Sequence, residues 1–288
     1  MSASKKALLF GVDSFTGRYL KQAFEKNGVS VVGTTLSTNL STDCDITDYH
    51  QCVQFIKATN PDYVVNLSGI SFVPFSDYKK IYEVNFSGAI NILRACEDYA
   101  PNCCLLLISS SQLYAQHPNA INESGSLEIS NHYSVSKNAM EMAAKLSSLN
   151  VRIARSFNYT GVGQSNQFLI PKIISHFKEK RESIILGDTN VFRDFSDVRD
   201  VVNAYVSILV SNTNDQLFNV CSNSVYSISD IINFLNQETG YTISVKESKE
   251  FKRSNVIPCV KGNNSRLSSL GWNPSHTLFD TLKWMLYD

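Results

Sequence analysis

The sequence predicts an α/β protein with a Rossmann-type, doubly wound parallel sheet and a smaller α/β carboxyl-terminal lobe. In the first half of the chain, short apolar runs typical of buried strands alternate with amphipathic stretches typical of helices. A glycine turn follows the first run at residue 11, and the alternation loosens after Ser156. We therefore expect a first domain over residues 1–156 and a second lobe over 157–288, with a segment near 190–210 returning to the first domain.

The individual elements follow from local patterns. A strand is expected where a short apolar run is bounded by turn residues, and a helix where apolar residues recur three and four positions apart. The strands are expected at residues 6–11, 29–32, 63–66, 105–109 and 151–155. The helices are expected through 19–24 and over 49–59, 79–100, 131–148, 168–181 and 227–239. In a parallel sheet of this kind the ligand site lies at the carboxyl ends of the strands.

The glycine turn lies between the first strand and the first helix. Gly11 and Gly17 bracket it, and Ser14, Phe15 and Thr16 lie within it. Such a turn lets the backbone approach a pyrophosphate, which then lies on the amides and the positive dipole end of the helix. Ser14 replaces the middle glycine of the usual pattern, so the fingerprint is imperfect. Its place directly after a strand nevertheless predicts that these five residues contact a dinucleotide.

The end of the second strand bears on which dinucleotide binds. Thr34 and Thr35 follow it, without the Asp or Glu that commonly binds the 2′-hydroxyl of NAD. Because hydroxyls repel a 2′-phosphate less than a carboxylate does, NADPH is the expected cofactor, although no arginine is present there, and NADH or NAD remain alternatives. Asp45 and Ile46 are expected to flank the adenine. Their alternative roles are a helix cap and a core isoleucine.

Tyr133 and Lys137, four positions apart, are the best indication of chemistry. On a helix the two side chains share a face, where the ammonium can stabilise a phenolate, and Ser110 from a strand end can hold the reacting oxygen. The arrangement suits carbonyl reduction or its reverse. The spacing alone arises about once by chance in a chain of this composition, so a surface tyrosine beside a lysine is the alternative.

The composition predicts a soluble metabolic enzyme. With 43% hydrophobic residues, 18% charged residues and a net charge of zero, the chain can bury a full core and offers no basic surface to nucleic acid. Seven cysteines without a Cys-x-x-Cys spacing predict reduced core thiols, no metal site and a cytoplasmic location. The first residues are too short for a signal peptide, and no apolar run approaches the ~18 residues of a membrane span.

With these residues in view, the chain resembles the extended short-chain dehydrogenase/reductase superfamily over essentially its whole length. The resemblance rests on Gly11-x5-Gly17, Asp45-Ile46, Asn66-Leu67-Ser68-Gly69, Val84-Asn85, Ser109-Ser110-Ser111-Gln112-Leu113-Tyr114, Tyr133-x3-Lys137 and Arg155-Ser-Phe-Asn158, in that order. It implies that Tyr133 is the acid/base, that Lys137 stabilises its phenolate and binds the nicotinamide ribose, and that Ser110 bonds the substrate oxygen. It also implies cofactor contacts from Leu67, Ser68, Gly69 and Asn85.

The residues after Ser110 bear on the reaction type. In that superfamily, sugar-nucleotide 4,6-dehydratases carry an acidic residue just after the catalytic serine or threonine. Here Ser111 and Gln112 follow, and neither can act as a carboxylic acid. A dehydratase is therefore disfavoured, while a C4 reductase and a C4 epimerase both remain.

The carboxyl half resembles the GDP-4-keto-6-deoxy-mannose reductases, which form GDP-rhamnose-type sugars. The matching segments begin at Arg155, Arg193, Phe218 and Gly271. By that resemblance the smaller lobe binds a sugar nucleotide, with Arg193 and Arg253 facing its phosphates. The implied substrate-binding residues are Ser71, Ser111, Gln112, Asn158, Gln164, Arg193 and Arg253.

Several alternatives stay open. Arg193 could form a salt bridge with Asp194 or Asp197 instead, and Arg253 could lie in a solvated basic loop. Val256 replaces an acidic residue of the subgroup, so a CDP-, UDP- or dTDP-linked sugar, or a seven-carbon sugar, is not ruled out.

The leading hypothesis is an NADPH-dependent 4-ketoreductase that makes a deoxysugar for a surface polysaccharide such as lipopolysaccharide. The alternatives are a C4 epimerase with tightly bound NAD and a non-enzymatic, dinucleotide-sensing regulator. The superfamily often dimerises through two long helices per subunit, so we expect a homodimer through a four-helix bundle of the helices carrying Asn85 and Tyr133.

Overall fold

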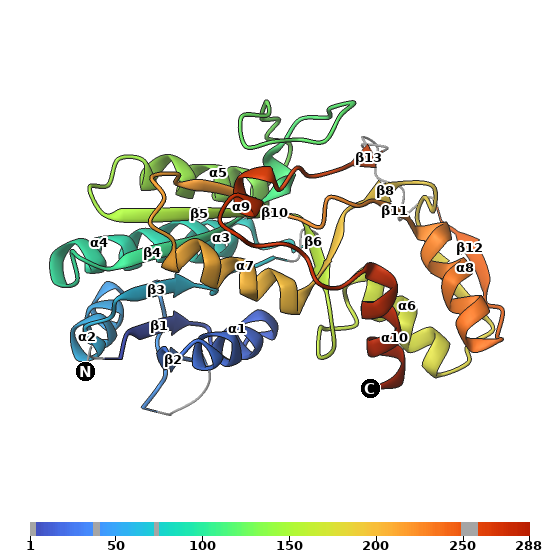
Figure 1. Cartoon of the computed structure of the whole chain (residues 1–288), viewed down its shortest axis with the longest axis horizontal. Coiled ribbons are helices and arrows are strands. Elements are labelled where there is room, and N and C mark those ends of the chain that lie inside the picture. The colour runs from blue at the N-terminus through green and yellow to red at the C-terminus, as the bar shows by residue number, and fades with distance from the viewer. Residues whose placement is uncertain (1–3, 37–40, 72–74, 249–258) are drawn as a thin grey trace.

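The computed structural model describes residues 4–36, 41–71, 75–248 and 259–288 of the chain. Its centre is a parallel sheet of six strands in the order β10-β5-β4-β3-β1-β2, with helices on both faces (Figure 1). These strands are β1 (Lys6–Phe10), β2 (Ser30–Thr34), β3 (Tyr63–Asn66), β4 (Cys104–Ser110), β5 (Asn150–Ser156) and β10 (Leu217–Val220). The Rossmann-type α/β fold that the sequence predicts is confirmed.

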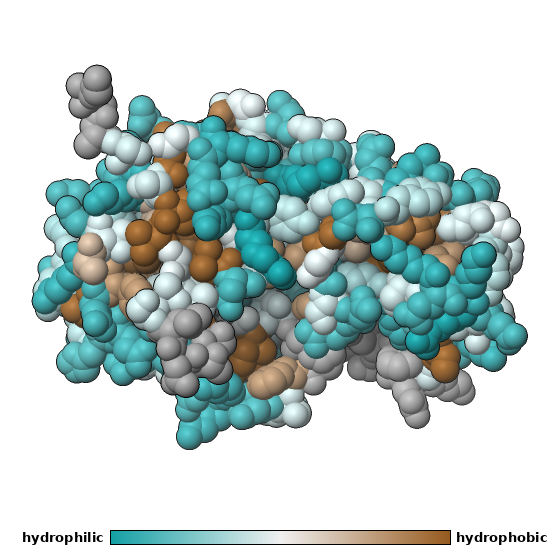
Figure 2. Space-filling view, turned by 90° about the horizontal axis from the view of Figure 1, so that it is seen from below, coloured by the Kyte–Doolittle hydropathy of each residue, from teal (hydrophilic) through white to brown (hydrophobic). Residues whose placement is uncertain are grey.

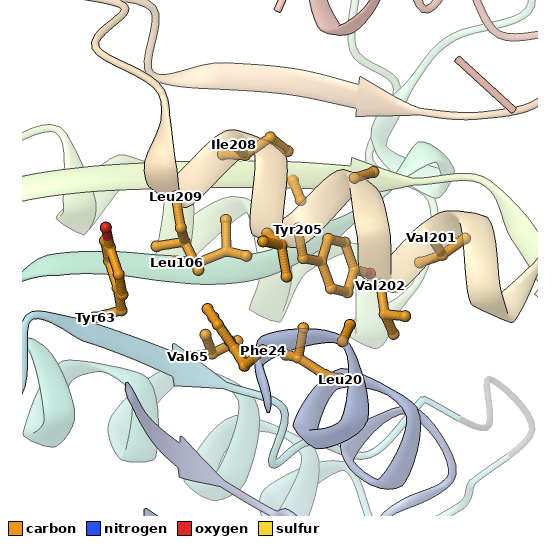
Figure 3. Close-up of a cluster of buried hydrophobic side chains, with 14 of the residues drawn as sticks. Leu20, Phe24, Tyr63, Val65, Leu106, Val201, Val202, Tyr205, Ile208 and Leu209 are labelled. Atoms are coloured by element: carbon orange, nitrogen blue, oxygen red, sulfur yellow. The ribbon is translucent and has the colours of Figure 1, made fainter. Parts of the chain in front are cut away.

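Strand side chains alternate between two hydrophobic cores on opposite faces of the sheet. The covering helices are α1 (Phe15–Lys26) and α7 (Val198–Val210) on one face, and α2 (Tyr49–Thr59), α4 (Ala89–Tyr99) and α5 (His132–Ala144) on the other. Leu9 of β1 belongs to the first core, whereas Leu8 and Phe10 belong to the second, because successive strand residues point to opposite faces. Figure 3 shows the first core, where Leu20 and Phe24 of α1 meet strand and α7 side chains.

The five predicted strands are all present, with ends shifted by one or two residues, and α2 has the predicted bounds. The sixth strand, β10, was not expected from the sequence. Its Asn219 interrupts the apolar pattern, yet it is fully buried. The Asn219 amide accepts a hydrogen bond from the Tyr114 hydroxyl at 2.7 Å and donates one to the Ile121 carbonyl at 2.8 Å. These partners, distant in sequence, make a polar residue compatible with a buried strand.

The helical stretch predicted over residues 79–100 is present, but it is not one regular α-helix. It consists of α3 (Tyr78–Tyr82), a π-helical segment (Glu83–Gly88) and α4. Within the π-helical segment, Asn85 binds the backbone of Ile70, accepting from its N–H at 2.7 Å and donating to its carbonyl at 3.0 Å. Gly88 lies against Ile46, where a Cβ atom would come within 2.5 Å of Cδ1. Long-range contacts thus widen the helix locally, which periodicity cannot foresee.

The small lobe follows the sheet (Figure 1, right). Its core contains residues of α6 (Leu169–Lys178), α8 (Ile228–Thr239), α10 (Leu278–Tyr287) and β7 (Ser183–Leu186), and β7 pairs with β12 (Ser244–Glu247). A second small sheet joins β11 (Tyr226–Ser227), β8 (Phe192–Arg193) and β13 (Cys259–Val260), and β6 (Asn158–Thr160) pairs with β9 (Phe195–Asp197). Two further short elements are a 3₁₀ turn (Ser111–Leu113) and α9 (Ser265–Ser268). Helix α7 lies between these pieces in sequence but packs on the main sheet.

Hydrophilic and hydrophobic residues are distributed unevenly over the lower face of the molecule. Seen from below, hydrophilic residues cover most of the small lobe, and hydrophobic ones gather over the half that holds the main sheet (Figure 2). Within the described residues, none of the helices combines the length and hydrophobicity needed to cross a bilayer. All seven cysteines are free thiols, and six of them are buried.

Candidate active site

The structure brings Ser110, Tyr133 and Lys137 together at the carboxyl end of β4. Helix α5 begins at His132, where the Asn131 side chain accepts a hydrogen bond from the Ser134 N–H and so caps the helix. Ser110 is the last residue of β4, and its hydroxyl is near enough to Tyr133 to act on the pKa of the phenol. The Lys137 ammonium lies 6.0 Å from the centre of the Tyr133 ring. A reacting oxygen beside Tyr133 would therefore meet both a hydroxyl and a cation.

Burial decides the protonation of this set. It raises the pKa of Tyr133 to about 12, although the neighbouring Ser110 hydroxyl acts in the opposite direction. It also lowers the pKa of Lys137 to about 8, while the nearby Glu141 carboxylate raises it. Stabilisation of the phenolate by the lysine would lower the pKa of Tyr133. In the protein without cofactor or substrate, the effect of burial is larger, and the pKa of Tyr133 is raised. At neutral pH, Tyr133 holds a proton that it can donate, and most Lys137 side chains are charged.

Helix α5 contacts the end of β4 at three successive turns. Tyr133 lies near Ser110, and Lys137 Nζ donates to the Ile108 carbonyl at 2.8 Å. One turn further, Glu141 Oε1 accepts from the Ser109 hydroxyl at 2.5 Å. The position of the tyrosine along β4 is therefore fixed by side chains four and eight residues after it.

Glu141 is also paired with Arg155 of β5. Arg155 Nε donates to Oε1 at 2.9 Å and Nη2 donates to Oε2 at 2.6 Å, and both side chains are almost fully buried. The sequence analysis missed Glu141. The signal was present, because residues 133, 137 and 141 are spaced to share one helix face.

The glycine turn has the geometry that a pyrophosphate site needs. Gly11 has φ +85°, and a Cβ atom on Gly17 would lie 2.4 Å from the Gly11 carbonyl oxygen. Ser14 has φ −63°, so no glycine is required at that position, and its hydroxyl caps α1 by accepting from Gly17 N at 3.0 Å. Phe15 stacks on Tyr159, 6.2 Å between ring centres. The turn therefore fits the dinucleotide, whose pyrophosphate would lie on the first amides of α1.

Thr16 and the end of β2 border the same turn. The Thr16 hydroxyl shares a hydrogen bond with the Tyr159 hydroxyl at 2.9 Å. The Thr34 carbonyl accepts from Gly11 N at 3.0 Å and from Val12 N at 2.9 Å. The Thr35 hydroxyl donates to Asp43 Oδ1 at 2.8 Å. The expected cofactor residues of β1 and β2 thus adjoin one another.

Asp45 and Ile46 have structural partners of their own. The Asp45 carboxylate accepts from Thr47 N at 2.9 Å and from the Thr47 hydroxyl at 2.7 Å. Ile46 is buried, whereas Asp48 is the residue that caps α2. The core role considered for Ile46 is therefore observed, and the cap belongs to Asp48.

The loop after β3 completes the cofactor edge. Leu67, Ser68 and Gly69 lie between Gly11, which follows β1, and Lys137. A Cβ atom on Gly69 would lie 3.2 Å from Asn85 Oδ1 and 3.6 Å from Lys137 Nζ, so glycine leaves space beside the ammonium. Because Asn85 binds Ile70, which follows Gly69, its observed role is to position this loop.

The expected substrate residues lie around the small-lobe side of the site. Ser111 and Gln112 form the turn after Ser110, and Gln112 N donates to the Ser110 hydroxyl at 3.2 Å. Asn158 of β6 is exposed, and its amide donates to the Asp194 carbonyl at 3.3 Å. Asn158 therefore lies beside the segment that carries Arg193.

The remaining residues expected to bind substrate differ in their surroundings. Gln164 is engaged within the protein, accepting from the Thr160 hydroxyl at 2.7 Å and donating to the Tyr159 carbonyl at 3.3 Å. Ser71 is exposed in the loop after β3. Arg253, with Val256, lies outside the described residues.

Of the two carboxylates expected as alternative partners of Arg193, Asp197 binds Arg199, and Asp194 binds Ser222 through Oδ1 while its Oδ2 has no hydrogen-bond partner among the residues that the structure describes. Asp197 pairs with Arg199 at 2.7 Å. Asp194 is fully buried and accepts from the N–H and hydroxyl of Ser222 at 2.8 and 2.7 Å, and burial raises its pKa to about 6. Arg193 itself is half-buried and donates to the Phe192 carbonyl at 2.8 Å. The two aspartates thus hold the ends of β9 in place.

A doubly wound sheet with a glycine turn, a Ser-Tyr-Lys set and a separate small lobe defines an extended short-chain dehydrogenase/reductase. The chain belongs to the NAD dependent epimerase/dehydratase family, whose profile matches residues 7–221.

Two curated relatives act on GDP-linked deoxysugars. The chain is 29% identical to GDP-6-deoxy-D-talose 4-dehydrogenase of Aggregatibacter actinomycetemcomitans, covering 91% of this chain and 90% of that protein. It is 30% identical to GDP-6-deoxy-D-mannose reductase of Pseudomonas aeruginosa, covering 79% and 80%.

Two solved structures are also similar. A putative epimerase from Burkholderia cenocepacia has a TM-score of 0.91 and 33% identity, covering 98% of this chain and 97% of that one. RMD from Pseudomonas aeruginosa complexed with NADPH has a TM-score of 0.86 and 26% identity, covering 98% of each. The family and these relatives indicate an NAD(P)-dependent oxidoreductase or epimerase of sugar nucleotides.

Replacing Glu141 by glutamine should lower the free energy of unfolding by about 3–5 kcal/mol, because Arg155 is left as a buried cation without its counter-charge. The double variant Glu141→Leu/Arg155→Met should recover most of this loss. Glu128→Gln, at an exposed glutamate, is the matched control and should change stability by less than about 0.5 kcal/mol. Urea unfolding followed by circular dichroism measures all three, and equal midpoints for Glu141→Gln and the control would contradict the assignment.

Proposed function

We propose that this protein reduces the C4 keto group of a nucleotide-linked 4-keto-6-deoxy sugar, most specifically GDP-4-keto-6-deoxy-mannose or a related GDP-deoxysugar. The observation that carries the proposal is the Ser110-Tyr133-Lys137 set without a carboxylic acid at the two following positions. Ser111 and Gln112 cannot remove water from the sugar, so the set can only transfer a proton to or from an alcohol oxygen. The GDP-sugar names of the two curated relatives support the choice of nucleotide.

In this proposal the nicotinamide group supplies the hydride when bound. Tyr133, which holds its proton at neutral pH, donates that proton to the oxygen at C4. Ser110 bonds the same oxygen and keeps it in line with the phenol, while the Lys137 ammonium stabilises the phenolate that remains. The hydrogen bonds of Glu141 with Ser109 and Arg155 hold helix α5, and with it Tyr133 and Lys137, in place against β4 and β5.

The sugar nucleotide would lie between the 3₁₀ turn and the small lobe. Asn158, exposed beside Asp194, would hold the sugar or the diphosphate. The Arg193 guanidinium would face the phosphates, which a guanidinium can bind in a bidentate manner. Arg253 would add a second one. We place the protein in the cytoplasm, with its product used for a surface polysaccharide.

A C4 epimerase is the second candidate, favoured by the 33% identity to a putative epimerase. An epimerase takes hydride from a sugar and returns it to the same sugar, so it would retain NAD through turnover. A non-enzymatic dinucleotide sensor is the third reading. It would have no use for a buried lysine beside a buried tyrosine, and we set it aside for that reason.

Purified protein should oxidise the reduced cofactor rapidly with GDP-4-keto-6-deoxy-mannose. The loss of absorbance of NADPH and of NADH is measured with that substrate and, in parallel, with the CDP-, UDP- and dTDP-linked ketosugars. The GDP sugar should give the highest kcat/KM. If no ketosugar is reduced and NAD is released on denaturation, the epimerase reading replaces the reductase.

Tyr133→Phe is the control for this assay. Removing only the proton donor should lower kcat by about 10²–10⁴-fold and leave cofactor binding unchanged. Tyr99→Phe alters a half-exposed tyrosine outside the site and should retain full activity. Full activity in Tyr133→Phe would overturn the proposed mechanism.

The pH dependence of reduction follows from the two pKa values. Both groups must be protonated, so kcat/KM should be constant in neutral solution and fall above about pH 8 as Lys137 loses its charge. Tyr133, with a pKa of about 12, keeps its proton in that range. In Lys137→Arg the guanidinium stays charged, so the fall should move to higher pH even though activity is reduced. An identical fall in both proteins would assign it to another group.

We also propose a homodimer through α4 and α5, because apolar side chains are exposed along α5 and just beyond it. Val135, Met142 and Leu146 are 40%, 54% and 89% exposed. Leu146→Glu should therefore convert a dimer to a monomer in light scattering coupled to size exclusion. Val210→Glu changes an exposed apolar residue of α7 and should not alter the mass. A wild-type monomer would refute this proposal.

A further inference from the structure

In a Rossmann fold, the adenosine ribose of a dinucleotide is bound at the end of the second strand, which here is β2. In a Rossmann unit the 2′-hydroxyl lies beside a residue about 20 positions after the glycine turn. Here Gly11 N and Val12 N both donate to the Thr34 carbonyl, so the turn lies directly against the end of β2. Thr34 is buried and Thr35 is half-buried, which makes Thr35 the accessible residue at this point.

The fold returns a carboxylate to that point from later in the chain. Thr35 N donates to the Thr42 carbonyl at 2.9 Å, and Cys44 N donates to the Thr35 carbonyl at 2.8 Å. Asp43 thereby forms a parallel bridge with Thr35, and the Thr35 hydroxyl donates to Asp43 Oδ1 at 2.8 Å. The acidic group that is missing directly after β2 in the sequence is thus present beside it in space.

The charges around this point are unfavourable to a 2′-phosphate. The chain has no lysine or arginine between Lys26 and Lys57, which includes β2 and the whole loop after it. Asp13, exposed in the glycine turn next to Val12, adds a second carboxylate on the neighbouring strand connection. A 2′-phosphate would bring up to about two further negative charges beside a stretch of chain that contains carboxylates but no lysine or arginine.

We propose that Asp43, held by Thr35, makes this protein selective for NAD(H) over NADP(H). Its carboxylate accepts the ribose 2′-hydroxyl and repels a 2′-phosphate. The sequence alone favours NADPH, because it shows no acidic residue directly after β2. The loop that carries Asp43 reverses that preference. The inference concerns the cofactor alone and holds for a reductase or an epimerase.

Cofactor binding without any sugar tests the inference. Dissociation constants of NADH and NADPH are measured by titration calorimetry, which needs no turnover. The wild-type protein should bind NADH at least about tenfold more tightly than NADPH, and Asp43→Asn should remove most of that difference by strengthening NADPH binding. Asp188→Asn, which removes one carboxylate in a small-lobe loop, is the matched control and should leave the ratio unchanged.

Two further measurements keep the test independent of folding defects. Thr35→Val retains the carboxylate but removes its hydrogen bond, so it should shift the ratio in the same direction by a smaller factor. In the wild-type protein, added salt should narrow the NADH preference, because screening weakens the repulsion. The inference is overturned if the wild-type protein binds NADPH as tightly as NADH or more tightly, or if folded Asp43→Asn keeps the wild-type ratio.

Discussion

The buried ion pair between Glu141 of α5 and Arg155 of β5 is the contact on which the arrangement of the site depends. Ser109 of β4 joins the same carboxylate, so one helix and two central strands meet there. On its other side, the Arg155 guanidinium lies 4.7 Å from the centre of the Tyr114 ring, and the Tyr114 hydroxyl donates to Asn219 of β10. The pair thus connects the catalytic helix to the sheet through to its edge strand.

A pair of this kind contributes more to geometry and charge than to stability. Burying two charges costs several kcal/mol each, and apolar side chains of similar volume often stabilise a core equally well. They could not, however, place Ser109 and Arg155 at defined points along α5. Nor could they oppose the effect of burial on Lys137, whose pKa falls to about 8 even with the Glu141 carboxylate one turn away. The carboxylate therefore helps to keep Lys137 charged at neutral pH.

Those parts of the fold and site that depend on residues close together in the sequence could be predicted from the sequence. The five expected strands are short, mostly apolar runs, and the helix face that carries Tyr133 and Lys137 follows from a four-residue spacing. What the sequence could not show depends on contacts between distant segments. Asn219 is compatible with a buried strand only because Tyr114 supplies a donor, and the helix around Asn85 widens because its amide binds the Ile70 backbone. The partnership of Thr35 with Asp43 likewise depends on the path of a loop.

Both ends of the cofactor site are controlled by a carboxylate from outside the recognised motif. In the site as we propose it, Asp43 would act at the adenosine end through its hydrogen bond with Thr35, and Glu141 would act at the nicotinamide end through Lys137. The chain has a formal net charge of zero, so its overall charge favours neither an anionic nor a cationic ligand, and local groups of this kind gain importance. Relatives that share every motif residue can therefore differ in cofactor preference and pH response. The decisive residues are those that the fold, rather than the motif, places within reach of the ligand.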